Sequence, residues 1–150
     1  MGTLKQINKN TGMAMILITH DMGIVANMAQ RVIVMYGGKI VETGAVLEIF
    51  ENAQHPYTRS LLASVPRLDA DSSKPLEYIL GSPPDMIEPP AGCPFAPRCR
   101  FSMKICHQQM PARTECANGH HVFCHLLDER AAAQRARFVA EYADTHLEEV

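Results

Sequence analysis

The stretch MILITHDMGIVANMAQRVIVMYGGKIVETG, residues 15–44, decides the fold class. It begins inside a continuously apolar, partly β-branched run, residues 13–19, which is typical of a strand buried on both faces in a parallel sheet. His20 and Asp21 end this run, and Asp21 is a suitable N-cap for a helix over residues 23–29. Two further strands, 31–36 and 39–42, flank a Gly-Gly turn of the hairpin type. The order of elements predicts an α/β fold with part of a parallel sheet.

The chain on either side of this stretch divides into four parts. Residues 1–65 complete the sheet part, with predicted helices over 4–10, 44–50 and 55–64 and Gly12 as a C-cap. Residues 66–90 contain six prolines and predict a linker. Residues 91–127 form a small irregular cysteine-stapled module. Residues 128–150 are rich in Ala, Arg and Glu and predict a terminal helix.

Composition narrows the class of protein. The 150 residues are 47% hydrophobic, which suits a folded globular chain, and the net charge of −2 implies no nucleic-acid partner. The longest apolar run is far too short to span a membrane, and the first dozen residues are too polar for a signal peptide. We therefore expect a cytoplasmic chain, in which five cysteines indicate metal ligation or catalysis before disulfides.

Four of the cysteines, Cys93, Cys99, Cys106 and Cys124, have the spacing C-x5-C-x6-C-x17-C. The surrounding segment has low apolar content and several prolines, so we expect thiolates to staple it through a metal or a cluster. The spacings are wider than the usual zinc knuckles and differ from the common ferredoxin runs. Spacing alone leaves both open, with zinc slightly favoured.

His20 follows the predicted buried strand, at the edge where open α/β sheets bind ligands. A neutral imidazole there can donate a hydrogen bond to a phosphate oxygen or orient a water molecule. It can equally satisfy loop carbonyls, and position alone does not choose between the two roles.

Residues 15–44 resemble the switch-histidine region of ABC-transporter ATPases. Residues 55–66, HPYTRSLLASVP, narrow the resemblance to the ATP-binding subunits of oligopeptide, dipeptide and nickel importers. The segments GSPP (81–84), GCPFAPRC (92–99), Gly119-His120 and Cys124-His125-Leu126 resemble the C-terminal extension of the same subfamily. The resemblance covers roughly residues 4–127.

This resemblance implies several properties. The fold would be the C-terminal part of a P-loop ABC ATPase sheet domain, and His20 would contact the γ-phosphate of ATP. Cys93, Cys99, Cys106 and Cys124 would ligate a [4Fe–4S] cluster, with zinc as the alternative. The partners would be transporter membrane subunits and a second ATPase subunit, at the inner face of the cell membrane.

The sequence lacks a G-x-x-x-x-G-K-[ST] phosphate loop, a Ser-Gly-Gly-Gln signature and an Asp-Glu pair before His20. Phosphoryl transfer needs these groups together, so ATP and Mg²⁺ are expected only in a complete protein, and this chain alone is expected to be inactive. The edges of the strand over 13–19 would then favour self-association.

Two other functions stay open. The first is a free-standing metal-binding or regulatory module. The second, less favoured, is a zinc hydrolase, because a hydrolase needs an open metal position and four thiolates favour a closed site. Cys116 lies outside the matching pattern and is expected to be a free thiol. Four histidines near the cysteines are interpreted as loop donors or as zinc ligands of a cluster-free protein (His107, His120, His121 and His125). Three basic residues are interpreted as a solvated surface or as a charge balance for the cluster (Arg98, Arg100 and Lys104).

Overall fold

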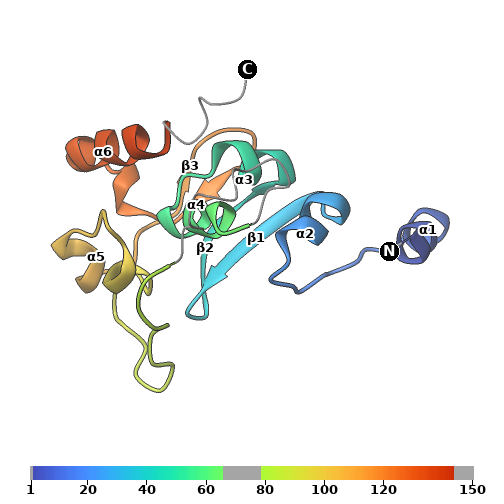
Figure 1. The fold of residues 1–150 in the computed structure, drawn as a ribbon, viewed down its shortest axis with the longest axis horizontal. Helices are drawn as coiled ribbons and strands as arrows, with labels where there is room; N and C mark the ends of the chain where they lie inside the picture. The colour runs from blue at the N-terminus through green and yellow to red at the C-terminus, as the bar shows by residue number, and fades with distance from the viewer. Residues whose placement is uncertain (1, 66–78, 144–150) are drawn as a thin grey trace, which may run out of the picture.

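A computed structural model describes residues 2–65 and 79–143 and shows a four-stranded antiparallel sheet with helices packed around it (Figure 1). The strands are β1 (Arg31–Tyr36), β2 (Lys39–Ala45), β3 (Thr114–Glu115) and β4 (His121–Val122), in the order β1-β2-β4-β3. The α/β class is confirmed. The sheet is antiparallel, however, and the parallel arrangement expected from residues 13–19 is absent from the described part of the chain.

The β1–β2 hairpin is built as its sequence predicts. Tyr36 pairs with Lys39 across a two-residue turn, in which Gly37 and Gly38 have φ of +51° and +70°. Both angles are in the left-handed region, which glycine enters without steric cost. The second strand runs to Ala45, three residues beyond its predicted end, because its later residues pair with β1 and with β4.

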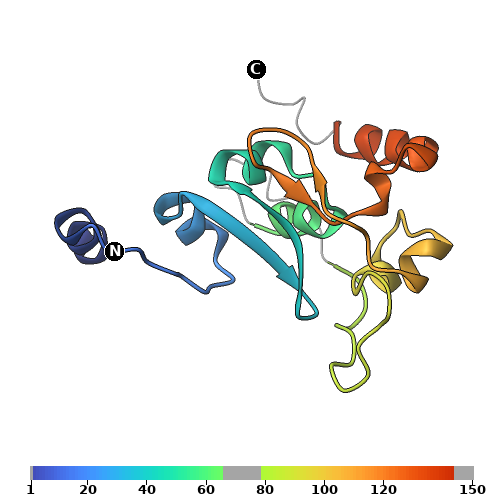
Figure 2. The same ribbon diagram turned by 180° about the vertical axis from the view of Figure 1, so that it is seen from behind.

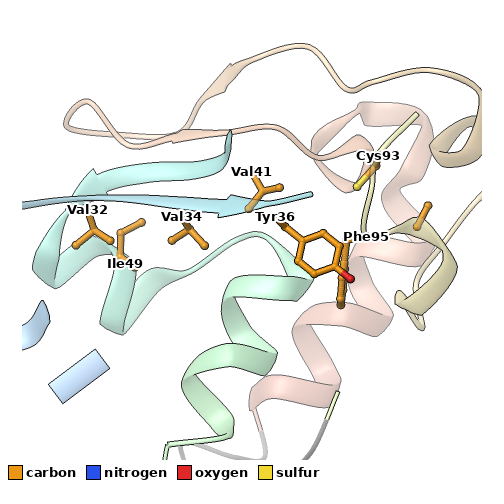
Figure 3. Close-up of a cluster of buried hydrophobic side chains, with 8 residues drawn as sticks. Val32, Val34, Tyr36, Val41, Ile49, Cys93 and Phe95 are labelled. Carbon is orange, nitrogen blue, oxygen red and sulfur yellow. The ribbon is translucent and has the colours of Figure 1, made fainter. Parts of the chain in front are cut away.

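One face of the hairpin forms the main hydrophobic core. Side chains alternate along β1, so that Val32, Val34 and Tyr36 are buried. They pack towards the helices α3 (Val46–Asn52) and α4 (Pro56–Ala63), and Figure 3 shows them with Ile49 of α3 and with Phe95. The N-cap predicted at Asp21 is confirmed by α2 (Met22–Met28), where the Asp21 carboxylate accepts from the backbone N–H of Ile24 at 3.0 Å. The helix predicted from residue 44 begins only at Val46, because Gly44 and Ala45 pair with β1 as part of β2.

The predicted strand over residues 13–19 is wrong. Every side chain from residue 11 to residue 20 is exposed, and Ile16 and Ile18 are 92% and 94% exposed. A strand needs a neighbour to accept its backbone hydrogen bonds, and this segment pairs with nothing among the described residues. It runs as an extended connection out to α1 (Gly2–Thr11), which lies apart from the sheet in both views (Figures 1 and 2).

The C-terminal half adds a second, smaller core. The helix α6 (Ala132–Ala143) lies within the predicted terminal helix, and its Phe138 and Tyr142 pack with Phe101 and Leu126. The Phe101 and Phe138 rings meet edge-to-face, with centroids 5.2 Å apart. Residues 66–78 of the predicted linker and 144–150 of the predicted helix lie outside the described residues. None of the described helices is both long and apolar enough to cross a membrane.

The segment over residues 91–127 does not depend on a staple alone, contrary to the sequence expectation. Cys93, Phe95 and Ala96 belong to the main core, and Phe101 belongs to the second one. The segment also contributes β3 and β4, which extend the sheet beside β2, and the short helix α5 (Lys104–Gln108). A few aromatic side chains in an otherwise polar segment are therefore enough to anchor it to the rest of the fold.

Candidate functional site

The four cysteines of the C-x5-C-x6-C-x17-C pattern line one small cavity of about 20 Å³. Cys93 and Cys99 flank the short 3-10 helix Ala96–Arg98, Cys106 lies in α5, and Cys124 precedes the 3-10 helix His125–Leu127. Three segments thus bring the four cysteines to one cavity. Phe95, Phe101 and Leu126 surround them with apolar contacts, while His55 and His125 contribute to the wall.

Glycine at position 92 allows two of these segments to meet. The Cys93 N–H donates to the Cys106 carbonyl at 2.8 Å. A Cβ at Gly92 would lie 2.7 Å from the His107 carbonyl carbon, and closer still to the Cys106 oxygen. Because the atoms in the way are backbone, only glycine fits without moving the two cysteines apart.

Backbone N–H groups point at each of the four sulfurs. The Met103 N–H donates to Cys106 Sγ at 3.5 Å, and N–H groups of Phe95, Phe101 and Leu126 lower the pKa of Cys93, Cys99 and Cys124 respectively. These donors favour thiolates, the form in which cysteine binds metals.

Burial has the opposite effect on the pKa values. When no cation is bound, burial outweighs the backbone donors. It raises the pKa of Cys99 to about 12 and raises the pKa values of Cys93 and Cys124, and the neighbouring thiols raise them further. Cys93, Cys99 and Cys124 are therefore neutral thiols unless a cation compensates the negative charge of their thiolates.

The expected metal site is not confirmed as such. Among residues 2–65 and 79–143, no group of three or more His, Cys, Asp or Glu side chains is arranged to hold a metal ion. All five cysteines are free thiols. Cys116 is exposed and does not line the cavity, in agreement with its position outside the matching pattern.

His55 lies between the helix α4 and the cysteine cavity, and it is 1% exposed. Its Nδ1 accepts the N–H of Tyr57 at 3.1 Å, which caps α4. Its Nε2 lies 3.9 Å from Cys93 Sγ. Burial lowers the pKa of His55 to about 4, and the nearby Glu42 carboxylate only partly offsets this effect.

Glu42 is a second buried polar group that the sequence did not single out. Its carboxylate accepts from the backbone N–H groups of Gln54 and His55, at 2.6 and 3.1 Å, and pairs with His120 Nε2 at 2.8 Å. It therefore joins β2, the start of α4 and the turn before β4. A sequence signal existed, because an acidic residue inside an apolar strand needs a buried partner, but the partner lies 78 residues away.

The other residues near the cysteines bond to neighbouring loops and helices. Arg98 donates to the carbonyls of Ile79 and Leu80 and to the Tyr36 hydroxyl, and Arg100 pairs with Glu141. His107 bonds to Ser102, and His125 Nε2 lies 3.0 Å from the Gln109 carbonyl oxygen. His120, expected to be a loop donor or a zinc ligand, is the buried partner of Glu42.

His20 lies in the exposed connection before α2 and is not part of the cysteine cavity. The neighbouring Asp21 is occupied as the N-cap of α2. The structure thus brings Cys93, Cys99, Cys106 and Cys124 together and leaves His20 separate from them. No described element places a phosphate loop beside His20, because the sequence contains no G-x-x-x-x-G-K-[ST] motif.

The comparisons with known proteins agree with one another. Residues 41–106 match the family described as the C-terminal region of oligopeptide/dipeptide transporters. The chain is 50% identical over 127 residues to the dipeptide transport ATP-binding protein DppD of Bacillus subtilis, covering 85% of this chain and 38% of that protein. It is 47% identical over 124 residues to the oligopeptide transport ATP-binding protein OppD of the same species, covering 83% of this chain and 35% of that protein.

A putative peptide import ATP-binding protein of Brucella ovis is 46% identical over 123 residues, covering 79% of this chain and 36% of that protein. The chain thus spans between a third and two fifths of the length of the curated relatives it matches. The matched family region includes Glu42, His55 and three of the four clustered cysteines. The chain thus matches the C-terminal region of peptide-transport ATP-binding proteins.

Proposed function

We propose that this chain acts within an energy-coupling ATPase subunit of an importer for oligopeptides or dipeptides. The observation that carries the proposal is the identity of 41–50% to ATP-binding proteins of peptide transport, over about four fifths of this chain. Residues 1–65 would complete a nucleotide-binding domain, followed by a linker over 66–90, the cysteine segment over 91–127 and a terminal helix over 128–150. The subunit would work at the inner face of the cell membrane with membrane subunits and a second ATPase subunit.

In that assembly His20 would contact the γ-phosphate of ATP, and Mg²⁺ and the phosphate loop would come from sequence that this chain does not contain. The exposed position of His20 is compatible with this role, since its ring is free to meet a nucleotide held by another part of the protein. The exposed apolar side chains of residues 13–18 would be covered in the same way.

A chimera tests this function. The matching C-terminal region of Bacillus subtilis DppD is replaced by this chain, and dipeptide uptake is measured in cells that lack DppD. We expect uptake to be restored, and His20→Ala in the chimera to lower ATP hydrolysis more than tenfold, roughly the loss of one transition-state contact. A well-expressed chimera that assembles with its partners but transports nothing, or one in which His20→Ala hydrolyses ATP normally, would contradict the proposal.

The chain by itself is proposed to hydrolyse no ATP and to self-associate through residues 13–19. ATP turnover above that of a His20→Ala control would contradict the first statement. A monodisperse monomer in light scattering would contradict the second.

We further propose that Cys93, Cys99, Cys106 and Cys124 ligate a [4Fe–4S] cluster, with zinc as the alternative. Two features support a thiolate-bound cofactor: the four sulfurs share one cavity, and a backbone N–H points at each of them. Among the described residues, no group of three or more His, Cys, Asp or Glu side chains is arranged to hold one metal ion, as a zinc site requires. A cluster attaches each thiolate to a different iron atom and accepts a wider arrangement.

The proposed role of the cluster is structural. It would tie the three cysteine-bearing segments to one another at the seam between the two hydrophobic cores, in addition to their aromatic contacts. Absorption in the thiolate-to-iron charge-transfer region, with metal analysis of anaerobically purified chain, distinguishes iron from zinc.

A further inference from the structure

We infer that His55 donates a hydrogen bond from its Nε2–H to the sulfur of Cys93 and thereby sets the reduction potential of the proposed cluster. This inference rests on the proposed [4Fe–4S] site. His55 is a positioning residue for that site, since it acts through a ligand and does not itself bind the cofactor.

The tautomer of the His55 ring follows from its first hydrogen bond. The Tyr57 N–H donates to Nδ1 at 3.1 Å, so Nδ1 carries a lone pair and no proton. A neutral imidazole then has its proton on Nε2. That nitrogen lies 3.9 Å from Cys93 Sγ, within the range of a long hydrogen bond to sulfur. The ring can therefore only donate towards the sulfur and cannot accept from it.

The ring is enclosed by protein. His55 is 1% exposed, it lines the cysteine cavity, and the Glu42 carboxylate accepts its backbone N–H at 3.1 Å. Because Nδ1 already accepts the Tyr57 N–H, the second nitrogen is the one that carries a proton next to Cys93 Sγ.

The ring is also fixed in orientation. Glu42 holds the His55 backbone, Pro56 begins α4 directly after it, and the Phe95 ring packs against the imidazole with centroids 6.1 Å apart. Capping a helix alone requires only a short polar side chain such as Ser or Asn. The imidazole exceeds that need, and its additional nitrogen reaches the ligand sulfur.

A hydrogen bond to a ligand thiolate withdraws electron density from the sulfur and stabilises the reduced, more negative cluster. Hydrogen bonds to the sulfurs are among the main factors that set cluster potentials. The His55 donor should therefore raise the reduction potential relative to a chain that lacks it.

Two substitutions distinguish the role of Nδ1 as a helix cap from the role of Nε2 as a donor to the sulfur. In His55→Asn the side-chain oxygen replaces Nδ1 and keeps the cap on α4, but nothing reaches Cys93. In His55→Gln the longer amide places its NH₂ near the position of Nε2 and restores the donor, while the cap is weakened. His107→Asn is the matched control, because His107 is an exposed histidine directly beside Cys106 and bonds to Ser102 instead of a sulfur.

The experiment uses the anaerobically reconstituted chain of residues 1–150 and measures the reduction potential by a redox titration followed by electron paramagnetic resonance. For His55→Asn we expect the equilibrium constant for reduction to fall about three- to tenfold, roughly 30–60 mV for one electron. For His55→Gln and His107→Asn we expect a potential close to that of the wild type. Iron and sulfide analysis of each sample confirms equal loading.

Different failures have different meanings. A loaded His55→Asn chain with the wild-type potential would overturn the role of His55 and leave the cluster in place. Equal shifts in His55→Asn and His55→Gln would also overturn it, because cavity repacking would then explain both. A wild-type chain that takes up no iron would overturn the cluster itself and, with it, this inference.

Discussion

Replacing Glu42 by glutamine should destabilise the chain more than any single change on its surface. The carboxylate accepts three hydrogen bonds, from the N–H groups of Gln54 and His55 and from His120 Nε2, and it is fully buried. A glutamine keeps one oxygen and turns an NH₂ group towards a donor. Hydrogen bonds to a charged acceptor contribute about 1.5–3 kcal/mol each, and a buried donor left unpaired costs about 1–3 kcal/mol. We therefore expect Glu42→Gln to lower the free energy of unfolding by about 2–4 kcal/mol.

Urea denaturation followed by circular dichroism measures this change. Glu48→Gln is the matched control, since Glu48 lies 3.9 Å from His120 Nδ1 but is partly exposed. The control should cost less than about 1 kcal/mol. If Glu42→Gln and Glu48→Gln cost the same, or if Glu42→Gln costs under about 0.5 kcal/mol, the three hydrogen bonds do not hold β2, α4 and the β4 turn together as described.

Three further changes follow from the same structure. Gly92→Ala places a methyl group against the backbone of Cys106 and His107 and should cost about 1–3 kcal/mol in urea denaturation. A cost under about 0.5 kcal/mol would contradict a backbone clash at position 92. Phe138→Ala removes the edge-to-face partner of Phe101 and should cost about 3–5 kcal/mol by thermal or urea denaturation, whereas a loss below about 1 kcal/mol would show that the second core is not cooperative with the first. Burial lowers the pKa of His55 from 6.5 to about 4, so the unfolded chain takes up a proton on this histidine first as the pH falls. The free energy of unfolding of the metal-free chain should therefore be full above pH 6.5 and decline by up to about 3 kcal/mol towards pH 4. His55→Asn should reduce this decline.

Local elements of the fold could be predicted from the sequence because their signals are local. The Gly37-Gly38 turn, the Asp21 cap and the His55-Pro56 helix start each depend on residues within a few positions of one another. The strand over residues 13–19 could not be predicted correctly, since a continuous apolar run indicates burial but says nothing of the strand that must pair with it. In the described residues it has no such neighbour.

The site was predictable in part. The four cysteines that line one cavity were found from their spacing and from the family resemblance. The same reasoning underestimated Phe95 and Phe101, two aromatic residues that anchor the cysteine segment in the cores. The roles of Glu42, His55 and His120 depend on contacts across 13 to 78 positions of sequence, which no local pattern reveals.

The most direct test of a cofactor at the four cysteines is the iron and sulfide content of the chain purified without oxygen. We expect about four iron and four sulfide per chain, with a charge-transfer absorption, in the wild type and in Cys116→Ser, whose thiol is exposed and outside the cavity. Cys124→Ser should lose most of both. Stoichiometric zinc in the wild type, no metal at all, or full iron retention in Cys124→Ser would contradict the proposed cluster.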